Sequence, residues 1–231
     1  TANVDYGIQN PDDYFVTADP LVFLPQFNRG DPLGGGNAGT VPAFYGFPYS
    51  SSGNLSAPYQ LQASEIGSVW GVAYSKQAKK VFAAAFMKRF SGFGPLGSGG
   101  IYLLAPSGAT FTATQFYDMD ANGYRTRAAA GAVAYGVGSS YTLNGAGTQA
   151  NWLGPIDPVT NMPEGFGVIG VNGPAGRGLL PITNGQFNDP TAFDQVAKVG
   201  IGDIELSGDG KFLFVMNLFD RQLYRLELDN A

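Results

Sequence analysis

The sequence contains no cysteine and no histidine. The absence of cysteine excludes disulfides, thiolate catalysis and cysteine-ligated zinc or iron–sulfur sites. The absence of histidine excludes Ser-His-Asp and Cys-His catalytic arrangements, the usual histidine-ligated metals and a histidine-based pH switch. We therefore expect a binding or structural module rather than an enzyme.

Charge and long apolar runs are also scarce. Charged residues make up 13% of the chain, about half of the ~25% usual for a soluble domain, and the net charge is −5. The densest basic run is Lys79–Lys80, so nucleic acid is not an expected partner. No segment reaches the ~18 apolar residues that a membrane-spanning helix needs.

Glycine, proline and aromatic residues are abundant instead. The chain has 34 Gly, 15 Pro, 17 Phe, 12 Tyr and 2 Trp. Because the glycines have no collagen period and alternate with aromatic runs, they indicate many turns between short strands. We expect a single all-β domain over residues 1–231, loop-rich and irregular over 1–65 and regular over 66–231. The composition is typical of an exported bacterial protein, and we expect a mature form or a fragment of a longer chain.

Two segments share a pattern of strand, polar turn and strand. The last strand, 222–228, alternates Leu223, Arg225 and Glu227 with apolar side chains, as a strand with one buried face does. Aligning Gly67 with Gly202 gives a separation of 135 residues, or three steps of about 45, close to the ~40–50 residues of a propeller blade. The predicted strands are 14–17, 21–27, 41–47, 69–74, 81–86, 101–104, 109–117, 165–171, 202–206, 212–216 and 222–228, and one helix is predicted at 191–198 after Asp189.

The run Leu-Ser-Gly-Asp-Gly-Lys-Phe-Leu-Phe-Val-Met-Asn at 206–217 resembles the blade signature of YVTN/NHL-like β-propellers. In such blades an S-x-D-G-K turn joins two strands and V-x-N ends the second. Residues 67–104 look like a degenerate second copy. The pair is also similar to large bacterial surface proteins that carry propellers ahead of immunoglobulin-like repeats.

This resemblance implies a β-propeller, or a partial one, with long Gly/Pro-rich insertions. A closed propeller of six or seven blades needs roughly 250–300 residues. This chain of 231 residues would supply about five blades. Each short sheet has two apolar faces, and stacking sheets around an axis covers both. Glycine then permits close approach near the axis, and aromatic side chains fill the wider outer space.

One acidic motif has the spacing of an oxygen-ligand loop. The sequence D-x-D-x-N-G at 118–123 places oxygen side chains on alternate residues, as hard cations such as Ca²⁺ require. The EF-hand pattern fails at Ala129, where a bidentate Glu is needed. The alternative is an Asn-Gly hairpin turn without metal. The candidate ligands are Asp118, Asp120, Asn122, the carbonyl of Tyr124, and Thr126.

Tryptophan and carboxylate side chains offer other sites. Trp70 stands beside Val69 and Val72, which predicts core packing, whereas Trp152 follows a polar stretch and is freer to bind a sugar. Carboxylate pairs can hydrolyse glycosides without histidine, but no spacing selects a pair. Asp203 is expected to satisfy backbone groups between strands. The carboxylates considered are Glu65, Asp157, Glu164, Asp194, Asp203 and Glu205.

These observations favour a non-catalytic extracellular or cell-surface module that mediates adhesion or assembly. Aromatic loops with little charge suit protein–protein contact, in which aromatic anchors carry most of the affinity. The expected partner is a protein or a surface glycan. Two alternatives stay open: a carbohydrate-binding or carboxylate-dependent glycoside-processing protein, and a subunit of an extracellular layer or filament.

Overall fold

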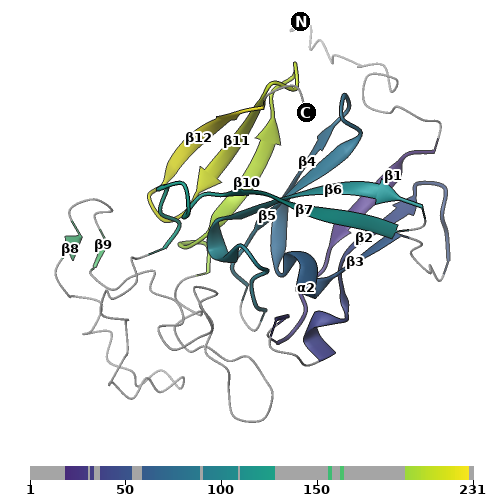
Figure 1. Ribbon diagram of the computed structural model, residues 1–231, viewed down its shortest axis with the longest axis horizontal. Coiled ribbons are helices and arrows are strands. Elements are labelled where there is room, and N and C mark those ends of the chain that lie inside the picture. The colour runs from purple at the N-terminus through teal and green to yellow at the C-terminus, as the bar shows by residue number, and fades with distance from the viewer. Residues whose placement is uncertain are drawn as a thin grey trace, which may run out of the picture.

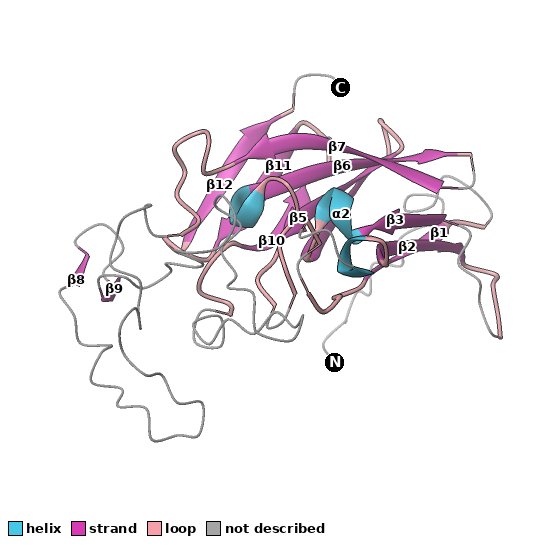
Figure 2. Cartoon of the chain, turned by 60° about the horizontal axis from the view of Figure 1, so that its bottom comes forward, coloured by secondary structure: helices cyan, strands magenta, loops and turns pink. Residues whose placement is uncertain are grey.

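A computed structural model describes residues 19–30, 32–33, 37–53, 59–88, 91–108, 110–127, 156–157, 162–163 and 196–228. Strands dominate this part of the chain (Figure 2), so the expected all-β class is confirmed. The strands are β1 Leu21–Pro25, β2 Pro42–Pro48, β3 Tyr59–Gln62, β4 Val69–Ser75, β5 Lys80–Ala85, β6 Gly100–Ser107, β7 Thr110–Asp118, β8 Ile156–Asp157, β9 Met162–Pro163, β10 Ile201–Leu206, β11 Phe212–Asn217 and β12 Gln222–Glu227.

The strands form three antiparallel meanders and a separate β8–β9 pair. The sheet orders are β1-β2-β3, β4-β5-β6-β7 and β10-β11-β12, with β4–β7 between the other two (Figure 1). The helical elements are single turns: η1 Asn37–Gly39, α2 Ala63–Ile66 and η2 Gly97–Gly99. Within the described ranges, no helix has the length and apolar character to cross a bilayer.

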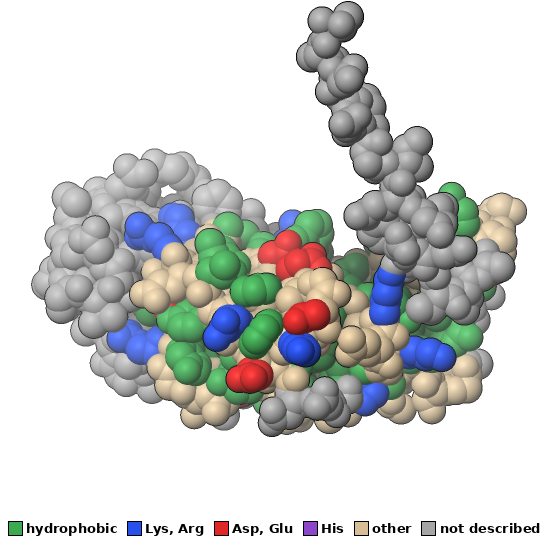
Figure 3. Space-filling model, turned by 90° about the horizontal axis from the view of Figure 1, so that it is seen from above, with side chains coloured by type: hydrophobic (Ala, Val, Ile, Leu, Met, Phe, Trp, Pro, Cys, Tyr) green, Lys and Arg blue, Asp and Glu red, His purple; other side chains and the backbone are tan. Residues whose placement is uncertain are grey.

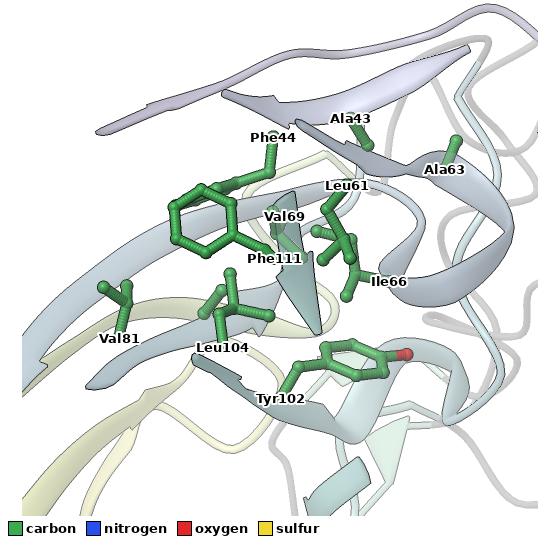
Figure 4. Close-up of a cluster of buried hydrophobic side chains, with 11 residues drawn as sticks. Ala43, Phe44, Leu61, Ala63, Ile66, Val69, Val81, Tyr102, Leu104 and Phe111 are labelled. Carbon is green, nitrogen blue, oxygen red and sulfur yellow. The ribbon is translucent and has the colours of Figure 1, made fainter. Parts of the chain in front are cut away.

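One face of the middle sheet packs on the N-terminal sheet. Phe44 of β2 and Leu61 of β3 point toward Leu104 and Phe111 from the opposite layer (Figure 4). The Phe44 and Phe111 rings meet edge to face at 5.9 Å between centroids. Large apolar side chains on alternating strand positions therefore interdigitate between the two layers.

The other face of the middle sheet packs on the C-terminal sheet. Phe82 and Ile101 from the middle sheet share a buried cluster with Ile204 and Leu213 from the C-terminal sheet. Because both faces of β5 and β6 are covered, β5 is apolar at nearly every position.

Among the residues that the structure describes, Tyr102 is the largest fully buried side chain. Its hydroxyl oxygen accepts a hydrogen bond from the Leu96 backbone N–H at 3.1 Å. Burial raises the pKa of this hydroxyl well above its usual range. The hydrogen bond satisfies the polar end of a side chain whose ring fills the core.

The β4–β5 and β10–β11 hairpins are structural repeats of each other. Val69 pairs with Ala85 and Val72 with Ala83 across a bulge; in the same way, Ile201 pairs with Asn217 and Ile204 with Val215. An equivalent backbone hydrogen bond lies at the open end of each hairpin. The Phe86 N–H donates to the Ser68 carbonyl oxygen, and the Leu218 N–H donates to the Gly200 carbonyl oxygen.

The structural offset is 132 residues, as between Gln77 and Asp209, and the alignment of Gly67 with Gly202 is wrong by three residues. The two glycines have different roles. Gly67 ends α2 at φ +64°, whereas Gly202 lies within β10.

The two repeats are direct neighbours. A Cβ at Gly71 of β4 would lie 2.9 Å from the Ile204 backbone nitrogen and 3.0 Å from the Asp203 Cα. Gln77 Nε2 donates to the Asp209 carbonyl oxygen at 3.0 Å. The predicted separation by three blade steps is therefore wrong, because the side chains of these two sheets fill the space between them. Gly71 permits this close approach of the two backbones, whereas close approach at the axis of a propeller stays a prediction.

The N-terminal part is more regular than expected. Residues 21–62 contain the sheet β1–β3, which is regular structure within the part expected to be loop-rich. The predicted strands 21–27 and 41–47 correspond to β1 and β2, and the strand that was not predicted is β3, which follows a Ser/Gly/Pro-rich stretch. The predicted strands at 14–17 and 165–171 and residues 189–195 lie outside the described residues, and 196–198 form a turn rather than a helix end.

Gly71→Ala should destabilise the fold by about 1–3 kcal/mol, because the new methyl group meets backbone atoms of β10 that cannot rotate away. Urea unfolding measures the change. The matched control is Gly208→Ala, where a Cβ has no atom within 4 Å. Equal stability of the two variants would show that β4 and β10 are not in close contact.

Candidate functional site

Three aromatic rings and one lysine form a partly exposed group, here called the Trp70 cluster: Phe27, Trp70, Phe86 and Lys88. Trp70 stacks on Phe27 at 6.0 Å between centroids with an interplanar angle of 8°. Phe86 lies 6.1 Å from Trp70 and 6.2 Å from Phe27. Lys88 Nζ is 5.3 Å from the Phe27 ring centroid, a cation–π contact.

Trp70 is 56% exposed, so the prediction that it packs in the core is wrong. It lies at the bulge of β4, where residues 70 and 71 together oppose the single residue Ala84. A bulge re-aims side chains, and this one leaves the indole at the surface. Neither the bulge nor the distant partners Phe27 and Phe86 could be read from the local pattern. Trp152 lies outside the described residues.

The second candidate is the acidic loop, residues 118–127. Asp120 Oδ1 accepts a hydrogen bond from the Thr126 N–H at 2.8 Å, and Oδ2 accepts one from the Thr126 hydroxyl at 2.7 Å. Arg127 lies 3.8 Å from the same Oδ2. Both carboxylate oxygens of Asp120 therefore have protein partners.

Other residues of the predicted ligand set make hydrogen bonds within the loop, although these bonds use neither the Asn122 Oδ1 nor the Tyr124 carbonyl oxygen. Asp118 Oδ1 accepts from the Ala121 N–H at 3.2 Å, and Asn122 Nδ2 donates to the Asp118 carbonyl at 2.7 Å. The Tyr124 N–H donates to the Met119 carbonyl at 2.8 Å. These contacts are those of a self-closed Asx-rich turn.

The acidic loop also joins the middle sheet to the C-terminal sheet. Met119 is fully buried in the core that these sheets share. Asn217 Nδ2 donates to the Arg125 carbonyl at 2.8 Å, and the Gly200 N–H donates to the Thr126 carbonyl at 2.9 Å. The loop thus has a structural task independent of any ion.

A Ca²⁺ ion needs six to eight oxygen ligands. In the described part of the chain no three acidic side chains gather into a metal-binding group. Asp118 Oδ1 and Asp120 Oδ2 do converge, since each lies about 3 Å from the position of a Cβ on Gly99, at 3.0 and 2.9 Å. Calcium binding by Asp118, Asp120, Asn122, Tyr124 and Thr126 stays a prediction.

The carboxylates considered for hydrolysis have local backbone partners where they are described. Glu65 accepts from the Gln62 N–H at 3.0 Å and caps α2. Asp203 accepts from the N–H of its neighbour Ile204 in the same strand at 2.9 Å, and Glu205 accepts from the Leu206 N–H at 3.1 Å. The side chains of Asp157, Glu164 and Asp194 lie outside the described residues.

Comparison with known proteins gives a short match. A 56-residue stretch is 38% identical to Colossin-D of Dictyostelium discoideum and covers 24% of this chain and 6% of Colossin-D. No family model matches the chain. No solved structure matches it either.

Asp120→Asn should destabilise the fold by about 1–3 kcal/mol, because the neutral amide loses charge-assisted hydrogen bonds from the Thr126 hydroxyl and its attraction to Arg127. Chemical denaturation measures the loss. The control Glu205→Gln removes one negative charge from a strand position and should stay within about 0.5 kcal/mol of the native chain. Asp120→Asn as stable as this control would contradict the role assigned to Asp120.

If the acidic loop holds calcium, millimolar Ca²⁺ should raise the melting temperature, since a ligand of the folded state stabilises it. Asp118→Asn should abolish the rise. Differential scanning calorimetry with Ca²⁺ and with EGTA is the measurement. Identical melting in the two buffers would refute the calcium prediction.

Proposed function

We propose that this chain is part of a YVTN/NHL-like β-propeller and serves as a non-catalytic binding module at a bacterial cell surface, in adhesion or assembly. The observation that carries the binding role is the exposed Trp70 cluster. The propeller part of the proposal is supported by the relation between the sheets.

Equivalent residues of adjacent propeller blades lie beside each other. Gly71 lies against Asp203, and Gln77 contacts Asp209, each pair at the repeat offset of 132 residues. The N-terminal sheet stacks on the opposite face of β4–β7, with β1 contacting β4 through Phe23 and Tyr74 at 6.5 Å. Successive meanders packed face to face support radial stacking.

Both end sheets keep apolar side chains on their outer faces. Leu24 of β1 is 53% exposed and Leu223 of β12 is 65% exposed. Met216 of β11, which pairs with Leu223, is also exposed. In the proposed propeller, further blades cover these faces.

The surface supports a contact with a protein partner. Hydrophobic side chains alternate with single Lys/Arg and Asp/Glu side chains on the side of the molecule seen in Figure 3. Surfaces on which both signs of charge are mixed bind partners through a few aromatic anchors rather than through a patch of one charge sign. Trp70 presents one broad anchor, held in place by Phe27 and Phe86.

The exposed indole also favours a second candidate, binding of a surface glycan. A ring backed by Phe27 presents an apolar platform on which the apolar face of a sugar can stack. The two candidates differ in competition: soluble sugars displace a glycan ligand and leave a protein contact unchanged.

Trp70→Ala should abolish concentration-dependent self-association of the chain, measured by sedimentation velocity, without lowering its melting temperature by more than a few degrees. Association should be lost because the variant lacks the aromatic anchor. The melting temperature should change little because the Trp70 side chain is already half exposed in the folded chain. Tyr49→Ala removes another exposed ring and serves as the control.

A panel of soluble mono- and oligosaccharides is added in a second arm. Inhibition by a sugar supports the glycan alternative, and insensitivity supports protein contact. Wild-type chain and Trp70→Ala that sediment alike as monomers at every concentration would contradict an assembly role for the cluster.

A further inference from the structure

A cavity of about 240 Å³ opens between the middle and C-terminal sheets, away from the Trp70 cluster. It is lined in part by the β4–β5 turn and the β10–β11 turn, both at the top of the molecule in Figure 1. The hydrogen bond from Gln77 to the Asp209 carbonyl joins these turns. The structural repeat therefore builds the cavity from equivalent parts of two sheets.

The inner wall of the cavity is apolar. Phe82, Leu103 and Phe116 line it, one from each of β5, β6 and β7. The Phe82 and Phe116 rings meet edge to face at 5.0 Å and 74°. Phe82 is almost fully buried, but Leu103 and Phe116 are only partly covered by the core. An aliphatic or aromatic group that enters would cover this remaining apolar surface.

The cavity also carries two cations. Lys80 begins β5 and Lys211 belongs to the β10–β11 turn, and one carboxylate, Glu227, stands beside them. No salt bridge within 4 Å is found for either lysine in the described ranges, but the Asp209 carboxylate of the same turn attracts Lys211. Two lysines against one carboxylate give the cavity lining itself a net charge of +1, in a chain of net charge −5.

We propose that this cavity binds a protein partner through an apolar side chain that lies next to a carboxylate, as at the C-terminal residue of a peptide. The volume is below the ~300–1,000 Å³ of sites for drug-sized ligands, so one side chain is a suitable occupant. The apolar wall takes that side chain, and Lys80 and Lys211 take the carboxylate. The inference rests on the proposed function, which supplies a protein partner.

N-acetyl-phenylalanine and its uncharged C-terminal amide are the matched probes, titrated into ¹⁵N-labelled chain by NMR. The acid should shift the amide signals of Ala78, Gly210 and Lys211, and the uncharged amide should bind more weakly. Lys80→Gln and Lys211→Gln should each weaken binding of the acid about two- to fivefold, the range of one exposed ion pair. Arg221→Gln, in the turn between β11 and β12, removes a positive charge at the far end of the same sheet and should leave binding unchanged.

Equal affinity for the acid and the amide, shifts that map elsewhere, or unchanged binding in the double lysine variant would each overturn the inference. The outcome is separable from that of the proposed function. Trp70→Ala should keep its affinity for the acid, because Trp70 does not line the cavity. Normal Trp70-dependent association without probe binding refutes the cavity alone, and probe binding without such association refutes the role of the Trp70 cluster alone.

Discussion

Burial of both faces of the β4–β7 sheet is the constraint on which the rest of the structure depends. Phe111 and Leu104 are covered by β1–β3, and Phe82 and Ile101 by β10–β12. Each large apolar side chain that is fully buried contributes about 1.5–3 kcal/mol, so neither neighbouring sheet is dispensable. A single meander of this length could not shield two apolar faces from water. The three sheets are therefore one cooperative unit, although each is local in sequence.

The features with functional interest lie where these sheets meet. The Trp70 cluster combines a residue that follows β1 with residues of β4 and the end of β5. The acidic loop and the cavity both lie between the middle and C-terminal sheets, and both use residues from each. Packing sheets face to face buries their centres but leaves their ends open, and these ends are where polar and aromatic side chains from different sheets come together.

Local pattern predicted much of the fold. The strands at 69–74, 81–86, 109–117 and 212–216 are present within one residue at each end, because alternation and turn residues act over short distances. The repeat was also detectable, but its register was not. The sequence alignment matched Gly67 with Gly202 because both are glycine. The equivalent backbone hydrogen bonds instead make Ser68 the counterpart of Gly200. The two glycines satisfy different backbone needs, one ending a helical turn and the other lying within a strand.

Composition and periodicity by themselves determined that this chain is all-β, poor in charge and without cysteine or histidine chemistry. Only the tertiary structure decided that the two repeats touch, that a bulge places Trp70 at the surface, and that Lys80 and Lys211 share a cavity. The physical reason is the distance along the sequence over which the deciding interactions act. Strand formation depends on neighbouring residues, whereas exposure and the meeting of distant side chains depend on which sheet covers which face.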